Sequence, residues 1–249
     1  MNRVIVTCML VVGLLLGWLV SPTTGVPILA YHQVSEADDI YSVTAGQFEE
    51  QMAYLAEKGY NAISLKELFD FFDGKGNLPD KPIVITFDDG YEDNVLTALP
   101  IMEKYKMRST VFVVPSLVGT TEYLSWEQVS EMQKHHTEIG SHTMSHVGMN
   151  EISSVDQRRE LQESKTALEE HLGQPITFFA YPYGQFTAIT QQLLKDTGYR
   201  GACSGITGLN NKGTDVYALK RVNIPHPKVG LWEFRLRLFR ANLYSKLGI

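Results

Sequence analysis

Two adjacent aspartates, Asp88 and Asp89, follow the apolar run Pro82–Phe87 and precede Gly90. In parallel α/β folds, functional side chains collect at the carboxyl ends of strands, where neighbouring residues can point in different directions. One carboxylate could therefore bind a metal ion while the other faces a substrate. The sequence Asp-Asp-Gly is also common in turns, so this pair alone does not establish chemistry.

Two histidines, His142 and His146, lie four positions apart and again follow a strand-like segment. Imidazoles at this spacing can bind one metal ion from a single turn or a tight loop. With one carboxylate of the Asp88-Asp89 pair they would form a His₂-carboxylate site, which leaves a coordination position open for water. A histidine pair can also cap or pack, but the combination with the aspartates favours a metal site.

Two further segments would complete a catalytic centre. In the turn Tyr181–Gly184, Pro182 restricts the backbone and Gly184 allows it to approach a ligand closely. Such a turn can direct a backbone N–H toward a developing oxyanion; the alternative is an aromatic turn that covers the core. His32 follows the strand-like segment 26–31 and is a candidate general acid, because unperturbed imidazole titrates near pH ~6.5.

These side chains require a scaffold that brings several strand ends together. Strand-like segments alternate with amphipathic helical patterns, which predicts parallel β/α units. The expected strands are 26–31, 61–64, 82–87, 109–114, 138–141, 177–181, 201–204 and 221–224. The expected helices are 45–58, 65–73, 95–106, 126–135, 155–172 and 188–197. Seven or eight such units fit a barrel better than an open sheet.

Several expected helices begin with a capping box, in which Ser or Thr is followed three residues later by Gln or Glu. The pairs are Thr44/Gln47, Ser64/Glu67, Ser125/Gln128 and Ser154/Gln157. A further helical segment at 231–247 mixes aromatic, aliphatic and basic residues. A basic amphipathic helix can lie on a membrane surface. We favour the alternative, a terminal helix packed on the barrel with its cations in solvent.

The first residues indicate export. Arg3 is followed by an uncharged apolar run from Val4 to Val20, which is typical of a signal peptide or an uncleaved anchor. We expect residues 1–25 to be a signal peptide or N-terminal membrane anchor, with membrane association through residues 4–20. Residues 26–249 are then a single domain.

Composition is ordinary for a globular protein, with 249 residues, 44% hydrophobic and 20% charged. A net charge of −6 lacks the broad basic footprint of a nucleic-acid-binding protein. Cys203 would be the single cysteine of a chain without its leader, which excludes an internal disulfide there. We interpret it as a buried strand residue rather than a nucleophile.

Three motifs, in this order and spacing, resemble the NodB-homology polysaccharide deacetylases of carbohydrate esterase family 4: Thr86–Asp89, His142–His146 and Tyr181–Gly184. The early pair Tyr31-His32 is similar to the subgroup that deacetylates poly-β-1,6-N-acetylglucosamine. The resemblance extends from Pro27 to Ile224. It implies an α/β fold, a distorted (β/α)₇ barrel of the NodB-homology type.

The resemblance also implies catalytic roles. Asp88 would be the general base and His32 the general acid. Asp89, His142 and His146 would bind one divalent ion, Zn²⁺ with Co²⁺ or Ni²⁺ as alternatives.

It further implies substrate contacts. The backbone N–H of Tyr183, beside Pro182, would help to stabilise the oxyanion. Similar proteins have an aromatic residue beside the groove where this chain has Trp126, although a core tryptophan is an equal interpretation.

One position departs from the family pattern. The wider family has an arginine, which holds the base aspartate, where this chain has Ala180. We hypothesise that Arg221 supplies the missing cation. His226 weakly resembles a late family motif and is a second candidate acid, ranked below His32.

The expected function is metal-dependent hydrolysis of N-acetyl groups on an extracellular or cell-wall polysaccharide that contains N-acetylglucosamine, of the poly-β-1,6 type. A peptidoglycan or chitin-oligomer deacetylase would share every catalytic residue and is the alternative. Outside the enzymes, the alternative is a carbohydrate-binding protein. The expected location is extracytoplasmic, the expected partner is the polysaccharide and not nucleic acid, and no oligomeric state follows from the sequence.

Overall fold

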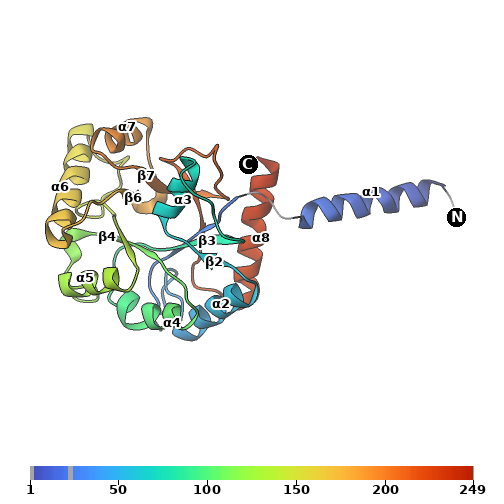
Figure 1. Cartoon of the computed structure of the whole chain (residues 1–249), viewed down its shortest axis with the longest axis horizontal. Helices are drawn as coiled ribbons and strands as arrows, with labels where there is room; N and C mark the ends of the chain where they lie inside the picture. Colours follow the sequence, from blue (N-terminus) through green and yellow to red (C-terminus); the bar gives the residue numbers. More distant parts are fainter. Residues whose placement is uncertain (1–2, 22–24, 249) are drawn as a thin grey trace.

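A closed parallel barrel forms the body of the molecule in the computed structural model, which describes residues 3–21 and 25–248 (Figure 1). Seven strands follow one another around the ring in the order β1-β8-β7-β6-β5-β4-β3, and β3 pairs back to β1, while β2 extends β3. The strands are β1 (Ile28–Tyr31), β2 (Asn61–Ala62), β3 (Pro82–Phe87), β4 (Thr110–Val113), β5 (Glu138–Ser141), β6 (Phe178–Ala180), β7 (Gly201–Thr207) and β8 (Leu219–Asn223). The expected (β/α)₇ barrel is confirmed.

Between the strands lie the helices α2 (Ala45–Glu57), α3 (Leu65–Phe72), α4 (Leu99–Lys104), α5 (Trp126–Lys134), α6 (Ser154–Leu172) and α7 (Ala188–Asp196). The helix α1 (Arg3–Val20) precedes the first strand, and α8 (Leu231–Leu247) follows the last one. The short helical turns are the π-helix η1 (Asn94–Ala98) and the 3₁₀ turns η2 (Pro115–Leu117) and η3 (Pro182–Gly184). The expected helix 95–106 is divided into η1 and α4. Pro100 has no N–H to donate to the carbonyl four residues earlier, which interrupts a regular helix there.

The helix starts agree with three of the four expected capping boxes, at Thr44, Ser64 and Ser125. The fourth expectation, Ser154/Gln157, is wrong by one residue. Ser153 caps α6, because its side chain accepts a hydrogen bond from the backbone N–H of Asp156 at 3.2 Å.

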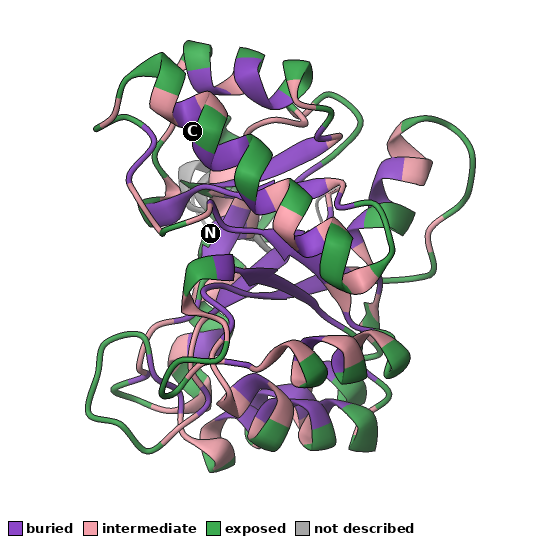
Figure 2. Ribbon diagram, turned by 90° about the vertical axis from the view of Figure 1, so that its left-hand side faces the viewer, coloured by how far each residue is buried: buried purple, intermediate pink, exposed green. Residues whose placement is uncertain are grey.

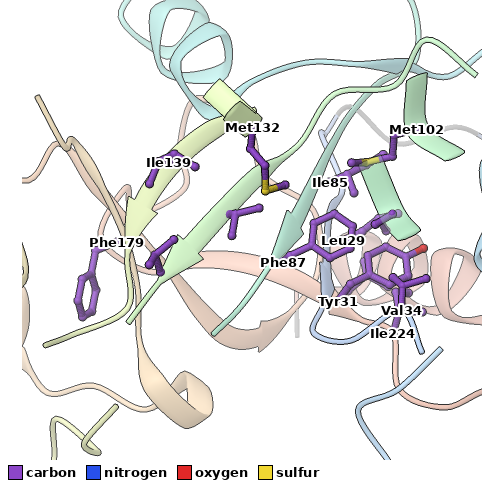
Figure 3. Close-up of a cluster of buried hydrophobic side chains, with 14 of the residues drawn as sticks. Leu29, Tyr31, Val34, Ile85, Phe87, Met102, Met132, Ile139, Phe179 and Ile224 are labelled. Atoms are coloured by element: carbon purple, nitrogen blue, oxygen red, sulfur yellow. The ribbon is translucent and has the colours of Figure 1, made fainter. Parts of the chain in front are cut away.

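Strand residues are buried on both faces, as expected for a parallel sheet covered by helices (Figure 2). Along β3, Ile83, Ile85 and Phe87 belong to the cluster between strands and helices, whereas Val84 belongs to the cluster inside the barrel. Figure 3 shows the outer cluster, in which Tyr31 lies beside Phe87 with ring centroids 5.5 Å apart. This alternation determines which side chains point into the barrel.

The amino-terminal end of the barrel is closed by α3. Leu65, Leu68 and Phe69 of that helix join the inner cluster, and Phe69 packs 4.8 Å from the ring of Phe178. The carboxyl ends of the strands form the opposite end of the barrel.

The helix α1 leaves the body on the side covered by α8 (Figure 1). It contains most of the expected leader, of which residues 1–2 and 22–24 lie outside the described residues. Among the described residues, no helix combines the length and the apolar character needed to cross a membrane. The expected packing of the C-terminal helix on the barrel is confirmed, since α8 contacts α2 and β8 and buries Phe234 and Ala241.

Candidate metal centre and active site

Three polar side chains reach the open mouth of the barrel because they continue the inward-facing pattern of their strands. Asp88 lies just beyond the end of β3, four residues after the inward-facing Val84. Arg221 lies two positions after the inward residue Leu219 on β8, and His142 lies just beyond β5. Side chains two residues apart on a strand point to the same face. The barrel thus brings together residues that are far apart in the sequence.

Asp89, His142 and His146 form one cluster, as predicted, with ligand atoms all within 4.8 Å of one another. Asp89 Oδ1 lies 3.3 Å from Nε2 of His142 and 3.1 Å from Nε2 of His146. Asp89 and His142 are buried, and Asp89 Oδ1 has no hydrogen-bond partner among the described residues. The expected set of three metal ligands is assembled.

The donor set fits a divalent cation. His142 Nδ1 lies 2.8 Å from the carbonyl oxygen of Ala180, to which it donates its proton. In the neutral ring, this bond leaves Nε2 with a lone pair that faces the Asp89 carboxylate. Two acceptors at this distance repel each other unless a cation lies between them, and metal-binding histidines usually donate their other N–H to such a carbonyl. An orphaned carboxylate oxygen between two imidazoles is the expected arrangement of a metal site.

Asp88 is held by the arginine that the sequence hypothesis named. Arg221 Nη1 donates to Asp88 Oδ1 at 2.7 Å, and Arg221 Nε donates to the carbonyl of Ser204 at 3.0 Å. Burial is the largest influence and opposes ionisation of Asp88, but the charge and hydrogen bond of Arg221, together with the nearby imidazoles of His142 and His32, outweigh it and lower the pKa of this carboxyl. Asp88 is therefore a charged carboxylate with one oxygen facing away from Arg221.

His32 lies on the other side of Asp88, with Nε2 4.0 Å from Asp88 Oδ2. Burial lowers the pKa of His32, and the nearby carboxylates Asp88 and Asp89 offset part of this effect. The side chain of Asn94 donates to the backbone carbonyl of His32 at 2.9 Å and so fixes the end of β1. The first residue of η1 thereby positions the candidate acid.

The loop between the two histidines has an unusual backbone. Thr143 and His146 both have positive φ, at 65° and 59°, which is a strained conformation for a β-branched residue such as threonine. The buried carboxylate of Glu160 on α6 stabilises the loop by accepting hydrogen bonds from the backbone N–H groups of Met144 and Ser145, at 2.8 and 2.9 Å. The loop geometry thus depends on a residue that the sequence analysis did not single out.

A cavity of about 410 Å³ opens above these groups. The predicted residues in its lining are His32, Asp88, Asp89, His142, His146, Tyr183 and Arg221. Ile40, Tyr41 and Tyr91 also line it and were not predicted, since they lie in loops without a motif. The ring of Tyr41 packs 4.8 Å from that of His32. The predicted metal ligands, base and acid therefore face one common space.

The predicted substrate contacts are only partly brought together. Tyr183 is exposed at the cavity, has φ 58° and packs its ring 5.1 Å from His146. Pro182 is buried beneath it and is not part of the lining. Trp126 also lies outside the lining; it is half-buried against the outer cluster and stacks on the exposed His171 with ring centroids 3.7 Å apart. His226 directs Nδ1 to the carbonyl of Ser42 at 3.1 Å, away from the catalytic groups.

A larger cavity, of about 850 Å³, lies at the amino-terminal ends of β1 and β3 and contains none of the predicted site residues. We assign the chemistry to the smaller cavity, because all the converging titratable groups are there. Cys203 is buried inside the barrel, and burial raises the pKa of its thiol to about 12, as expected for a structural cysteine.

Comparison with known proteins agrees with this geometry. Residues 75–202, which are 128 of the 249 residues, match the family model for polysaccharide deacetylase. The chain is 32% identical over 198 residues to YxkH of Bacillus subtilis (strain 168), which is named as a polysaccharide deacetylase; the match covers 80% of this chain and 71% of YxkH.

Two further proteins are similar to this chain, one in sequence and one in structure. The poly-beta-1,6-N-acetyl-D-glucosamine N-deacetylase of Escherichia coli (strain K12) is 27% identical over 224 residues, and the match covers 72% of this chain and 33% of that enzyme. The structure of IcaB from Ammonifex degensii superposes with a TM-score of 0.78 and 26% identity, over 89% of this chain and 98% of that one. The chain is therefore a member of the NodB-type polysaccharide deacetylase family, whose enzymes are hydrolases.

Proposed function

We propose that this protein is a metal-dependent N-deacetylase of an exported polysaccharide, with poly-β-1,6-N-acetylglucosamine as the first candidate substrate. The observation that carries the proposal is the unpartnered, buried Asp89 carboxylate between two imidazoles, with the Asp88 carboxylate beside it. A non-catalytic sugar-binding protein would need neither the base nor the metal ligands.

Asp88, His32 and Arg221 would perform the proton transfers of amide hydrolysis. Asp88 accepts the proton of the attacking water through the oxygen that faces His32, while Arg221 keeps the carboxylate ionised and oriented. His32 then donates a proton to the departing amine, which is a poor leaving group unless it is protonated. Products are acetate and a free amino sugar.

The metal ligands and the turn at Tyr183 would stabilise the negative charge that develops on the acetyl oxygen. A divalent ion held by Asp89, His142 and His146 supplies Lewis acidity and makes water acidic enough to ionise near neutral pH. Tyr183 has positive φ and lines the same cavity, and its backbone N–H would be a second donor to the oxyanion. Zn²⁺ suits the two imidazoles and one carboxylate, and Co²⁺ or Ni²⁺ are alternatives.

The relatives' names support the substrate, and the leader supports the location. The E. coli relative is named as a poly-beta-1,6-N-acetyl-D-glucosamine N-deacetylase, although this chain spans only 33% of that enzyme. The chain also superposes on IcaB over 89% of its own length. We propose that residues 1–25 direct the chain out of the cytoplasm as a signal peptide or anchor, and that residues 26–249 are the catalytic domain.

Acetate release tests this proposal. The purified chain is incubated with poly-β-1,6-N-acetylglucosamine, peptidoglycan, chitin oligomers and acetylated xylan. We expect release from the first polymer, loss of activity after chelation and recovery on adding Zn²⁺, Co²⁺ or Ni²⁺. Asp89→Ala should lose both bound metal and activity, whereas Asp88→Asn should keep the metal and lose turnover.

Asp196→Asn serves as the matched control, because this exposed carboxylate on α7 lies outside the site. Full activity in excess chelator, in protein shown to be free of metal, would reject the metal-dependent mechanism. Activity on peptidoglycan or chitin oligomers alone would keep the chemistry and replace the substrate.

A further inference from the structure

The helix α8 has two apolar faces, of which the barrel covers only one. Phe234 and Ala241 face inward and are buried, and Phe234 packs against Tyr54 of α2 with ring centroids 6.1 Å apart. Trp232, Leu236 and Phe239, here called the outer face of α8, are 62%, 52% and 39% exposed. A surface helix with a single partner normally has a polar outer side.

The three residues of the outer face form one continuous stripe. They lie at positions i, i+4 and i+7 of α8, which places them on the same side of the helix. Val229, just before the helix, is also exposed at 65%. Scattered exposed apolar residues are normal, but a contiguous stripe indicates a binding surface.

Arginines flank this stripe on both sides. At 3.6 residues per turn, Arg235 lies to one side of the stripe and Arg240 to the other, and both are exposed. Their guanidinium groups lie over aromatic rings, Arg235 over Trp232 at 5.3 Å and Arg240 over Tyr244 at 5.6 Å. The helix carries four basic residues and one acidic residue in a protein of net charge −6.

We propose that the outer face of α8 rests on an anionic lipid surface, with Trp232, Leu236 and Phe239 in the headgroup region and Arg235 and Arg240 against lipid phosphates. Aromatic and aliphatic residues bordered by arginine are the composition of a helix that lies in the plane of a membrane interface. The exposed arginines match the negative charge of such a surface.

The position of α1 favours a lipid surface over a protein partner. This helix leaves the body beside the last turn of α8, where Lys246 Nζ donates to the carbonyl of Ser21 at 2.5 Å (Figure 1). It exposes Leu10 and Leu14, so two apolar surfaces emerge on one side of the molecule.

A second copy of this chain fits the stripe poorly. A symmetric dimer would place the same patch on both subunits. Such an interface would bring Arg235 and Arg240 of both copies into one patch, and this accumulation of positive charge would oppose association.

Fluorescence of Trp232 in the full chain tests the proposal. The chain's three tryptophans are Trp18, Trp126 and Trp232. Trp18→Phe removes the tryptophan of α1, and the difference from Trp18→Phe/Trp232→Phe isolates Trp232. On vesicles that contain phosphatidylglycerol, we expect a blue shift of Trp232 emission and loss of most of it to brominated lipids. Arg235→Gln/Arg240→Gln, or high salt, should reverse much of both effects.

Ile189→Trp in the Trp18→Phe/Trp232→Phe background is the matched control. Ile189 is 57% exposed on α7, on the side of the barrel away from α8, so its replacement should stay unquenched (Figure 1). Unquenched Trp232 in protein that floats with the vesicles would overturn the proposal. So would a blue shift that grows with protein concentration when no lipid is present, because that result would assign the face to a second copy.

Discussion

The ion pair between Arg221 and Asp88 agrees with the hypothesis that this arginine supplies the cation missing at Ala180. Ala180 on β6 and Arg221 on β8 both occupy inward-facing positions near the carboxyl ends of their strands. The arginine expected at the position of Ala180 is absent, and Arg221 approaches the same carboxylate from a strand further around the ring. Successive side chains of a strand point alternately into the barrel and away from it. An arginine on another strand can therefore reach Asp88 only from an inward-facing position.

Replacing Arg221 with alanine should shift the pH dependence of turnover. Arg221 lowers the pKa of Asp88, so its removal raises that pKa and leaves the base protonated up to a higher pH. The acidic limb of the kcat profile should therefore move to higher pH, and kcat should fall by roughly 10–100-fold, as when other orienting partners are removed. Metal content, measured by atomic absorption, should stay unchanged.

Removing one partner of a buried ion pair costs about 3–5 kcal/mol, so Arg221→Ala will also unfold more easily. Arg221→Lys retains the charge and should restore part of the acidic limb. Arg200→Ala is the control, since that arginine pairs with Asp70 and Asp73 near the surface. An unshifted acidic limb in folded Arg221→Ala would show that this arginine does not tune the base.

At the level of single residues, motifs found most of the site. Asp88, Asp89, His142 and His146 follow strands, and strand ends meet at one edge of a parallel barrel. Arg221 follows no motif of its own; it was predicted only because Ala180 occupies the position where the wider family has an arginine. Tyr41 could not have been found, because loop conformation brings it to His32 and no spacing rule predicts that approach.

At the level of elements, α6 determines the geometry of the metal loop. Glu160 accepts hydrogen bonds from the backbone N–H groups of Met144 and Ser145 and from the Ser145 hydroxyl. These bonds hold Thr143 and His146 at positive φ, a conformation that costs of order 1–3 kcal/mol at each residue. The helix thus compensates for strain in the loop that presents both imidazoles.

Glu160→Ala should weaken metal binding without removing a ligand. The loop loses the acceptor that holds its backbone, and we expect an affinity loss of about 10–100-fold for Zn²⁺, typical of a lost supporting contact. Competition with a chromophoric chelator measures this affinity. Glu163→Ala, an exposed position on the same helix, should leave it unchanged. Equal affinity in the wild type and Glu160→Ala would mean that the loop keeps its shape alone.

The sequence predicted the starts of those helices that begin with a capping box. Thr44, Ser64 and Ser125 begin helices as predicted. The start of α6 differs from the expectation because Ser153, and not Ser154, caps the helix with Asp156, while the side chain of Gln157 accepts a hydrogen bond from Thr190 at 3.0 Å. The division of helix 95–106 is local in origin, yet a π-helix has no distinct hydrophobic period that would reveal it.

At the scale of the whole molecule, the barrel interior couples packing to chemistry. Gly140 lies on β5, two residues before His142, and faces the inner cluster. A Cβ atom at this position would lie 2.5 Å from Cδ1 and 2.6 Å from Cε1 of the Phe112 ring, and 3.0 Å from the carbonyl oxygen of Phe178. These neighbours are buried, so neither can move far.

Gly140→Ala should therefore destabilise the fold by about 1–3 kcal/mol, the usual cost of an extra methyl group in a packed core. Urea unfolding should show a lower midpoint with an unchanged slope. Gly46→Ala is a control of opposite sign: it lies in α2 with nothing within 4 Å of the added Cβ, and alanine should stabilise the helix by roughly 0.5–1 kcal/mol. Phe112→Leu removes the obstructing ring atoms, so the penalty of Gly140→Ala should shrink in that background. A penalty of the same size there would place the strain in the backbone of β5 and not in the ring contact.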